Sequence, residues 1–126
     1  MYKAMLVDDE KRVRSGLRRH FPWSAYGVSV EGEAASGLEA WEWLRDHPVD
    51  MVITDVRMPQ MDGIELARRL KERDPGVKVI FVSGYDALDY LKSALKVEAI
   101  DYILKSIALA QRGETIRRVT AMLDRE

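Results

Sequence analysis

The sequence predicts an α/β protein, a doubly wound (βα)5 fold whose five parallel strands lie in the order 2-1-3-4-5. Short apolar runs rich in β-branched residues alternate with longer segments whose apolar residues recur every three or four positions. Several of the short runs end directly in an acidic, hydroxyl or basic residue. Because the carboxyl ends of parallel strands meet at one edge of the sheet, the same pattern predicts a polar site at that edge.

Length and charge restrict the possible classes of protein. The 126 residues correspond to one domain, expected over residues 1–126. With 20 basic and 21 acidic side chains, the chain has no excess charge to attract nucleic acid or an anionic membrane. It has no cysteine, which excludes disulfides and fits the cytoplasm, and no segment resembles a membrane span. We therefore expect a cytoplasmic domain, with any DNA contact made by another domain.

Five runs are predicted to be strands. The third and fourth are nearly continuous hydrophobic stretches, as expected of strands covered on both faces. The predicted strands are Lys3 to Val7, Val28 to Glu33, Asp50 to Thr54, Lys78 to Val82 and Asp101 to Leu104.

Each segment after a strand carries apolar residues at helical spacing, which predicts five helices. The stripes are Val13-Leu17-Phe21, Trp41 with Leu44, Leu66 with Ala67 and Leu70, Ala87 with Leu91, Ala94 and Leu95, and Ile116 with Val119 and Leu123. Asp62 and Asp86 are predicted N-caps. The last helix is expected to begin near Ala108, with its first turns weakened by Gly113, which costs about 1 kcal/mol relative to alanine.

Acidic residues follow the first and third predicted strands. Asp8 and Asp9 come directly after the first apolar run, and Asp55 follows the third. These two strands are neighbours in the predicted order, so three carboxylates would meet in one cleft. Such oxygen ligands suit Mg²⁺, which keeps several waters and completes its shell with phosphate oxygens.

The fourth and fifth strands end in Ser83 and Lys105, which add a hydroxyl and a cation to the same edge. Carboxylate nucleophile, metal, cation and hydroxyl donor are the elements of phosphoryl transfer. Simpler interpretations exist for each residue. Asp8 or Asp9 could cap the first helix, Asp55 and Ser83 could be turn residues, and Lys105 could be a solvated surface charge. The coincidence at four strand ends favours the functional interpretation.

The motifs around these residues resemble a known family. They are Leu6-Val7-Asp8-Asp9-Glu10, the segment TDVRMPQMDG from Thr54 to Gly63, Val82-Ser83-Gly84, and Asp101-Tyr102-Ile103-Leu104-Lys105. In this order and spacing, over nearly the whole chain, they resemble the flavodoxin-like receiver domains of bacterial two-component response regulators.

The resemblance implies a role for each site residue. Asp55 would accept a phosphoryl group from a sensor histidine kinase. Asp9 and Asp55 would bind Mg²⁺ directly, together with the backbone carbonyl of Arg57, and Asp8 would act largely through water. Ser83 would hydrogen-bond the phosphoryl oxygens and Lys105 would pair with them. Such a domain catalyses its own phosphorylation and dephosphorylation but is not a turnover enzyme.

The family also implies an output. When Ser83 moves toward the phosphoryl group, the ring of Tyr102 would turn inward and reshape the face of the fourth helix, fifth strand and fifth helix, which is also a possible homodimer surface. Taken alone, Tyr102 would be a packing aromatic. Ser106 departs from the family, which usually has proline after the lysine. We expect phosphorylation to be retained, because the acidic residues are intact.

Further segments resemble receivers fused to AraC-type DNA-binding domains, namely His20-Phe21-Pro22-Trp23, Tyr26-Gly27-Val28 and Ser83-Gly84-Tyr85-Asp86. Phe21 and Trp23 could instead simply close the core. Three other functions share parts of the pattern. A dinucleotide binder would need a Gly-rich turn where Asp8 and Asp9 stand. A turnover phosphatase typically places a second acid where Arg57 stands. A degenerate receiver acting as a phosphorylation-independent interaction module is the main alternative.

Overall fold

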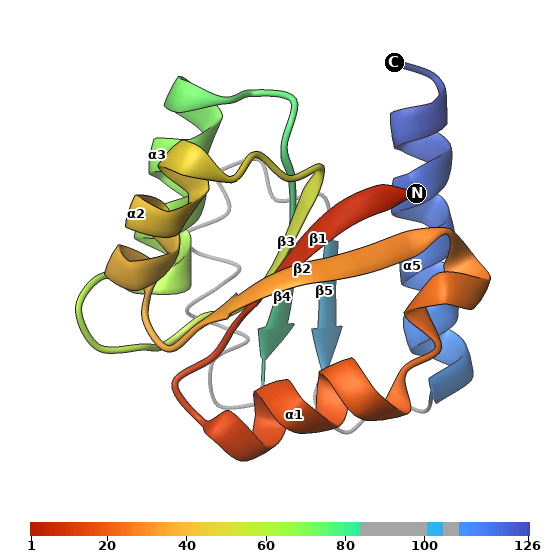
Figure 1. The fold of residues 1–126 in the computed structure, drawn as a ribbon, viewed down its shortest axis with the longest axis horizontal. Coiled ribbons are helices and arrows are strands. Elements are labelled where there is room, and N and C mark those ends of the chain that lie inside the picture. Colours follow the sequence, from red (N-terminus) through yellow and green to blue (C-terminus); the bar gives the residue numbers. More distant parts are fainter. Residues whose placement is uncertain (84–100, 105–108) are drawn as a thin grey trace.

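The computed structural model describes residues 1–83, 101–104 and 109–126, and shows a parallel sheet with helices on both faces (Figure 1). The described elements are β1 (Tyr2–Val7), α1 (Lys11–His20), the short 3-10 helix η1 (Trp23–Tyr26), β2 (Val28–Ala34), α2 (Gly37–Asp46), β3 (Met51–Asp55), α3 (Gly63–Arg73), β4 (Lys78–Ser83), β5 (Asp101–Leu104) and α5 (Leu109–Asp124). No helix in these ranges has the length and apolar character needed to cross a bilayer.

The strand pairing confirms the predicted order 2-1-3-4. β1 pairs in parallel with both β2 and β3, and β3 pairs in parallel with β4. The short strand β5 pairs with β4, beginning with Asp101 opposite Ile80. Each predicted strand differs from the observed one by no more than a residue at either end.

Two hydrophobic clusters cover the two faces of the sheet. Alternate residues of β1 point to opposite faces, so that Met5 and Val7 join the cluster under α2 and α3, whereas Ala4 and Leu6 join the cluster under α5. Figure 1 shows this division, with α2 and α3 on one side of the sheet and α1 and α5 on the other. This two-sided burial explains the nearly continuous apolar strand sequences.

The first helix ends one residue earlier than its apolar stripe suggests. Phe21 was expected to continue the stripe of Val13 and Leu17, but α1 ends at His20 and Phe21 has an extended backbone. The following Pro22 explains this, because a residue before proline is driven out of the helical region. Phe21 is nevertheless buried and packs edge-on against Trp23, with 4.6 Å between ring centroids. Closure of the core by Phe21 and Trp23 is therefore confirmed.

In the last helix, the structure gives Gly113 a packing role. The helix runs from Leu109 through Gly113, and a Cβ at this position would lie 2.1 Å from the hydroxyl oxygen of Tyr26. The glycine therefore provides the space that the Tyr26 side chain occupies. The fourth predicted helix, with the N-cap Asp86, and Ala108 lie outside the described residues. The other predicted N-cap, Asp62, is confirmed, since its Oδ1 accepts the Glu65 amide at 2.9 Å.

A hydrogen bond between Tyr2 and Asp124 ties β1 to the end of α5 and predicts a stability change at alkaline pH. The Tyr2 hydroxyl donates to the Asp124 carboxylate, and this bond, the largest cause, raises the pKa of Tyr2 to about 12 from 10.0. Because the pKa is higher in the folded protein, the stabilisation is complete below pH 10 and is lost as pH rises through 12. We expect the melting-temperature difference between the wild type and Tyr2→Phe to vanish over this interval; a constant difference would contradict the assignment.

Candidate functional site

The register of β1 and β3 places the predicted acidic residues at one edge of the sheet. Val7 pairs with Thr54, so Asp8 and Asp55 are the next residues along two neighbouring strands. Both are buried, with exposed fractions of 2% for Asp8 and 8% for Asp55. Burial of two acidic side chains at adjacent strand ends is costly unless they bind donors or cations.

Three carboxylates cluster in the turn after β1. The ligand oxygens of Asp8, Asp9 and Glu10 all lie within 4.8 Å of one another. Glu10 was not among the predicted ligands, and Asp55 stands outside this group of mutually close oxygens. Oxygen donors at this spacing, one of them buried, fit a hard divalent cation such as Mg²⁺.

Hydrogen bonds hold Asp8 in place. Its amide donates to the carbonyl of Ala34 on β2 at 3.0 Å, and its Oδ1 accepts the Glu10 amide at 2.9 Å. Neither Asp8 nor Asp9 is the N-cap of α1, because that position belongs to Glu10, whose side chain makes no capping bond. The simple capping interpretation of Asp8 and Asp9 is therefore wrong.

Asp55 is held by its own loop. Its Oδ1 accepts the amide of Val56 at 2.8 Å, which orients the carboxylate. Its backbone carbonyl accepts the hydroxyl of the fully buried Thr54 at 2.9 Å and lies against Gly63 at the start of α3. A Cβ on Gly63 would be 2.1 Å from this carbonyl oxygen. The end of β3 and the start of α3 are therefore packed without spare room.

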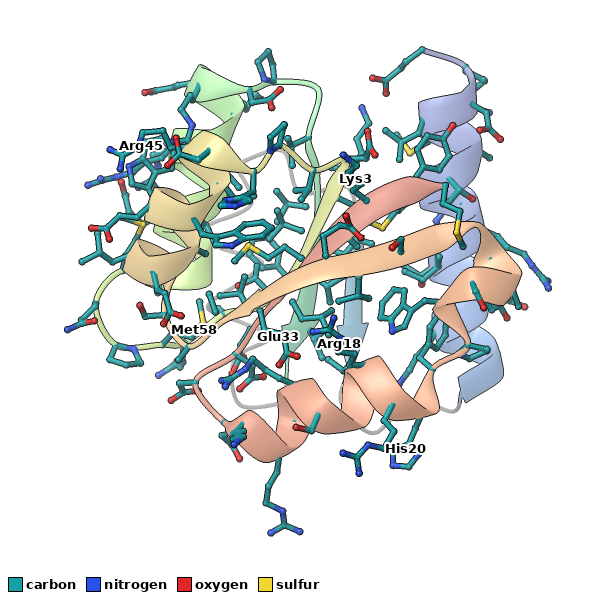
Figure 2. All side chains as sticks on the ribbon, in the orientation of Figure 1. Lys3, Arg18, His20, Glu33, Arg45 and Met58 are labelled. Atoms are coloured by element: carbon teal, nitrogen blue, oxygen red, sulfur yellow. The ribbon has the colours of Figure 1, made fainter. Side chains whose placement is uncertain are left out.

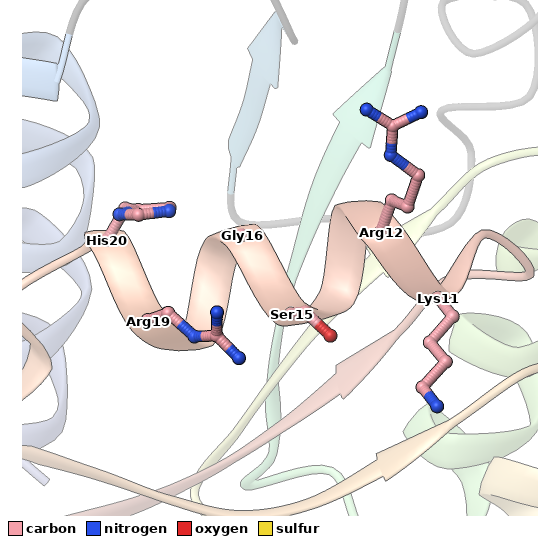
Figure 3. A pocket seen from close by; sticks show the side chains of 6 residues that line it. All are labelled: Lys11, Arg12, Ser15, Gly16, Arg19 and His20. Carbon is pink, nitrogen blue, oxygen red and sulfur yellow. The ribbon is translucent and has the colours of Figure 1, made fainter.

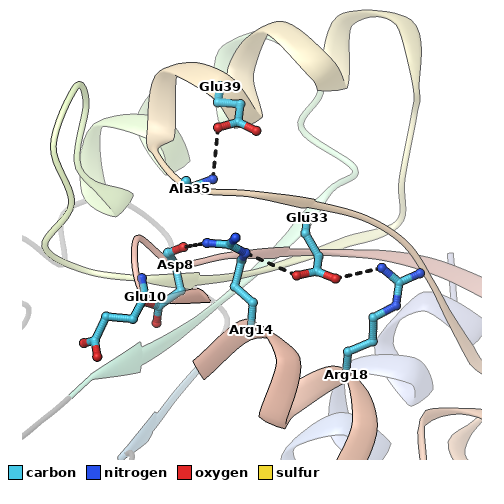
Figure 4. Close-up of polar contacts among 7 residues, drawn as sticks. All are labelled: Asp8, Glu10, Arg14, Arg18, Glu33, Ala35 and Glu39. Atoms are coloured by element: carbon cyan, nitrogen blue, oxygen red, sulfur yellow. Dashed lines mark hydrogen bonds and ion pairs between the residues drawn. The ribbon is translucent and has the colours of Figure 1, made fainter. Parts of the chain in front are cut away.

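A charged network joins the acidic turn to β2 (Figure 4). Arg14 Nη1 donates to the carbonyl of Asp8 at 2.5 Å, and its Nε donates to Glu33 at 3.2 Å. Arg18 donates to the other oxygen of Glu33 at 2.8 Å, and Figure 2 shows these two side chains facing each other. Arg18, and less strongly Arg14, hold the pKa of the Glu33 carboxyl below its ordinary value against the opposing effect of burial.

A surface hollow of about 340 Å³ runs along the outer side of α1 (Figure 3). It is lined by Lys11, Arg12, Ser15, Gly16, Arg19 and His20. Asp8, Asp9, Asp55 and Arg57, the predicted site residues whose side chains the structure describes, are not among these lining residues.

The remaining predicted site residues lie partly or wholly outside the described part of the chain. The backbone of Ser83 ends β4, one residue after Val82, which pairs with Asp55. The side chains of Ser83 and Tyr102 are not among those described, and Lys105 and Ser106 lie outside the described residues. Arg57 is exposed in the loop after β3, two residues from Asp55.

Several residues outside the predicted set shape the site. The sequence could have indicated Glu10 as a site residue, because it directly follows the two aspartates. It could also have indicated Thr54, which carries the lone hydroxyl in a strand that is otherwise apolar up to Asp55. No sequence feature indicates Arg14, because it is one of 20 basic residues and its contacts with Asp8 and Glu33 depend on tertiary structure.

The chain is similar in sequence to known response regulators. The profile of the response regulator receiver domain matches residues 4–117. The chain is 36% identical over all of its 126 residues to YesN of Bacillus subtilis, named as an uncharacterized transcriptional regulatory protein, and covers 34% of that protein. It is 33% identical over 98% of its length to the transcriptional regulatory protein HptR of Staphylococcus aureus, and covers 48% of it. The chain thus spans between about a third and a half of these curated relatives.

Solved structures show the same relationship. The receiver domain of AraT, a response regulator from Geobacillus stearothermophilus, superimposes with a TM-score of 0.92 at 32% identity, covering 98% of this chain and 96% of that one. A two-component transcriptional regulator AraC from Clostridium phytofermentans gives a TM-score of 0.90 at 35% identity, covering 99% and 97%. Both the family resemblance and its AraC-type character are confirmed. The chain belongs to the response regulator receiver domain family and is a signalling module rather than a turnover enzyme.

Proposed function

We propose that the chain is a phosphoacceptor receiver whose Asp55 takes a phosphoryl group from a sensor histidine kinase in a Mg²⁺-dependent reaction. The observation that carries this proposal is the register of β1 and β3, which places the buried Asp8 and Asp55 at neighbouring strand ends. Asp8 also belongs to the carboxylate cluster that it forms with Asp9 and Glu10.

Asp55 is the nucleophile in this proposal. A carboxylate oxygen of Asp55 forms a bond to phosphorus while the P–N bond of the kinase phosphohistidine breaks, and the bonding electron pair goes to the imidazole nitrogen. The Val56 amide, bound to Oδ1, keeps the carboxylate oriented during the attack. Preorganisation of this kind lowers the barrier by positioning the reacting atoms.

The proposed metal ligands are Asp9, Asp55 and the backbone carbonyl of Arg57, with Asp8 acting largely through water. When bound, Mg²⁺ would neutralise these carboxylates and attract the phosphoryl oxygens. The described donors fit this ion, because they are carboxylates and backbone carbonyls and offer no soft ligand.

Three further residues complete the proposed mechanism. Ser83 would hydrogen-bond a phosphoryl oxygen, Lys105 would pair with another, and Tyr102 would turn inward as Ser83 moves. The face formed by β5, α5 and the helix expected between β4 and β5 would then change shape. Ser106 stands beside Lys105 where the family usually has proline, whereas the acidic residues Asp8, Asp9 and Asp55 are all present.

The wider proposal concerns architecture, location and partners. Residues 1–126 would form one cytoplasmic receiver domain with the complete flavodoxin-like order 2-1-3-4-5. Its kinase would be a sensor histidine kinase, and phosphorylation would control a separate DNA-binding output domain, with homodimerisation through the switching face. The names of the transcriptional relatives HptR and AraC support such an output.

The first test is the intact mass of the protein after incubation with Mg²⁺ and acetyl phosphate. We expect one phosphoryl adduct, which should be lost in Asp55→Asn and after chelation of the metal, because the nucleophile or its counter-ion is then missing. An adduct that persists in Asp55→Asn would place the phosphoryl group elsewhere and contradict the proposed role of Asp55.

The alternative is a degenerate receiver that acts as a phosphorylation-independent interaction module. The replacement of proline by Ser106 favours this alternative, whereas the complete acidic set favours phosphorylation. Calorimetric titration with Mg²⁺ separates the two, because a module without phosphorylation has no need of the cation. Absence of both Mg²⁺ binding and an adduct would support the alternative.

A further inference from the structure

The contacts of Arg14 connect three parts of the molecule. It lies on α1, donates to the carbonyl of Asp8 in the turn after β1, and donates to Glu33 on β2. Its side chain is 15% exposed, compared with 47% for Arg18, which binds the same glutamate. Arg14 is therefore mostly buried next to the acidic turn, whereas nearly half of the Arg18 side chain is exposed, and Figure 4 shows both side chains reaching Glu33.

The contacts of Arg14 and Arg18 help to fix α1 against the sheet. None of the residues of α1 is fully buried, so apolar packing alone fixes the helix less firmly than it fixes α3, which has five buried residues. The two arginines bind Glu33 through separate oxygens and so tie the helix to β2. Because guanidinium groups donate in a fixed planar fork, Glu33 also sets the direction in which Arg14 reaches Asp8.

We propose that Arg14 is a positioning residue for the cation site. By holding the carbonyl of Asp8, Arg14 fixes the geometry of Asp8, Asp9 and Glu10. The inference rests on the proposed function, since it assumes that this turn binds Mg²⁺. Arg14 acts through the turn and does not touch the cation or the phosphoryl group. Residues that orient metal ligands in this way typically change metal affinity by about 10- to 100-fold when removed.

The sign of the effect separates positioning from simple electrostatics. Arg14 is a cation next to a cation site, so Coulomb's law alone predicts that removing its charge strengthens Mg²⁺ binding. Positioning predicts the opposite, because the carboxylates lose their arrangement. Lysine at this position keeps the charge but cannot bind Glu33 and the Asp8 carbonyl through a planar fork, so Coulomb's law predicts no change and positioning predicts weaker binding.

The experiment is calorimetric titration of the intact chain with MgCl₂ for the wild type, Arg14→Met, Arg14→Lys and the control Arg18→Met. We expect a Kd at least about tenfold higher in Arg14→Met, a smaller increase in Arg14→Lys, and no increase in Arg18→Met, which loses its bonds to Glu33 and Val30 but leaves Asp8 untouched. If Arg14→Met does not fold, as judged by circular dichroism, Arg14→Lys decides the question.

A second readout distinguishes positioning from a general loss of structure. The rate of Asp55 phosphorylation by acetyl phosphate should reach the wild-type maximum in Arg14→Lys at saturating Mg²⁺, with only the half-saturating concentration raised. A lowered maximum with unchanged half-saturation would overturn the proposal.

Three further outcomes are decisive. Unchanged or tighter Mg²⁺ binding in Arg14→Lys and Arg14→Met would overturn the role of Arg14 while leaving the proposed function intact. An equal loss of affinity in Arg18→Met would also overturn it, since the effect would then come from the docking of α1 in general. Failure of the wild type to bind Mg²⁺ would overturn the proposed function together with this inference.

Discussion

Replacement of Gly63 by alanine is expected to lower the free energy of unfolding by about 2 kcal/mol, because over-packing typically costs about 1–3 kcal/mol. A Cβ at this position would lie 2.1 Å from the carbonyl oxygen of Asp55 and 3.2 Å from the hydroxyl of Thr54. The new methyl group meets backbone, which cannot rotate away, so the end of β3 must shift. Urea denaturation measures the change.

The same substitution should slow phosphorylation, because the displaced carbonyl belongs to the proposed nucleophile. Gly16→Ala is the matched control. Gly16 also lies in a helix, but within the described part of the chain no atom outside its own helix backbone and chain neighbours lies within 4 Å of the position that a methyl group would take there, so alanine should raise the free energy of unfolding by about 1 kcal/mol. A Gly63→Ala variant as stable as Gly16→Ala would contradict the packing at Asp55.

Asp9→Asn is expected to change stability in opposite directions with and without Mg²⁺. Without the cation, the variant should melt at a higher temperature than the wild type, since it removes one of three carboxylates whose oxygens lie within 4.8 Å of one another. With Mg²⁺ at about 100 times its Kd, the wild type should gain about 2.7 kcal/mol. A tenfold loss of affinity in the variant would reduce this gain to about 1.4 kcal/mol.

Thermal denaturation with and without MgCl₂ measures both effects. Glu42→Gln is the control, because it removes one negative charge from the exposed side of α2, away from the acidic turn. It should leave the response to Mg²⁺ unchanged. An Asp9→Asn variant that responds to Mg²⁺ as strongly as the wild type would exclude Asp9 as a direct ligand.

Much of the architecture follows from local pattern. The run from Asp50 to Thr54 is predicted as a buried strand because both faces of a central parallel strand are covered, and the observed β3 spans Met51–Asp55, one residue further along. The N-cap Asp62 could likewise be predicted from the sequence, because a cap needs only a short polar side chain just before the first residue of the helix. Where the pattern was wrong, at Phe21, the neighbouring Pro22 supplies the reason.

The acidic site was predictable in part. Asp8 and Asp55 were identified because each stands at the end of an apolar run, and topology then brings those ends together. Glu10 was not assigned to the cluster, since whether its side chain turns toward Asp8 depends on the path of the turn after β1.

The sequence by itself determined the described strands and the helices α1, α2, α3 and α5 to within a few residues, because periodicity and strand ends are local properties. The fold class that the alternation of strands and helices predicts then gave the strand order 2-1-3-4 and the edge where the acidic residues gather. Tertiary structure alone decided which residues contact one another between these elements. Arg14 reaches Asp8 and Glu33, Gly113 makes room for Tyr26, and Gly63 lies against the Asp55 carbonyl. The contacts of Arg14 with Glu33 and of Gly113 with Tyr26 join residues far apart in the chain, and all of these contacts depend on how closely two elements pack. A hydrophobic pattern records which face of an element is buried, but not which side chain or carbonyl it will meet there.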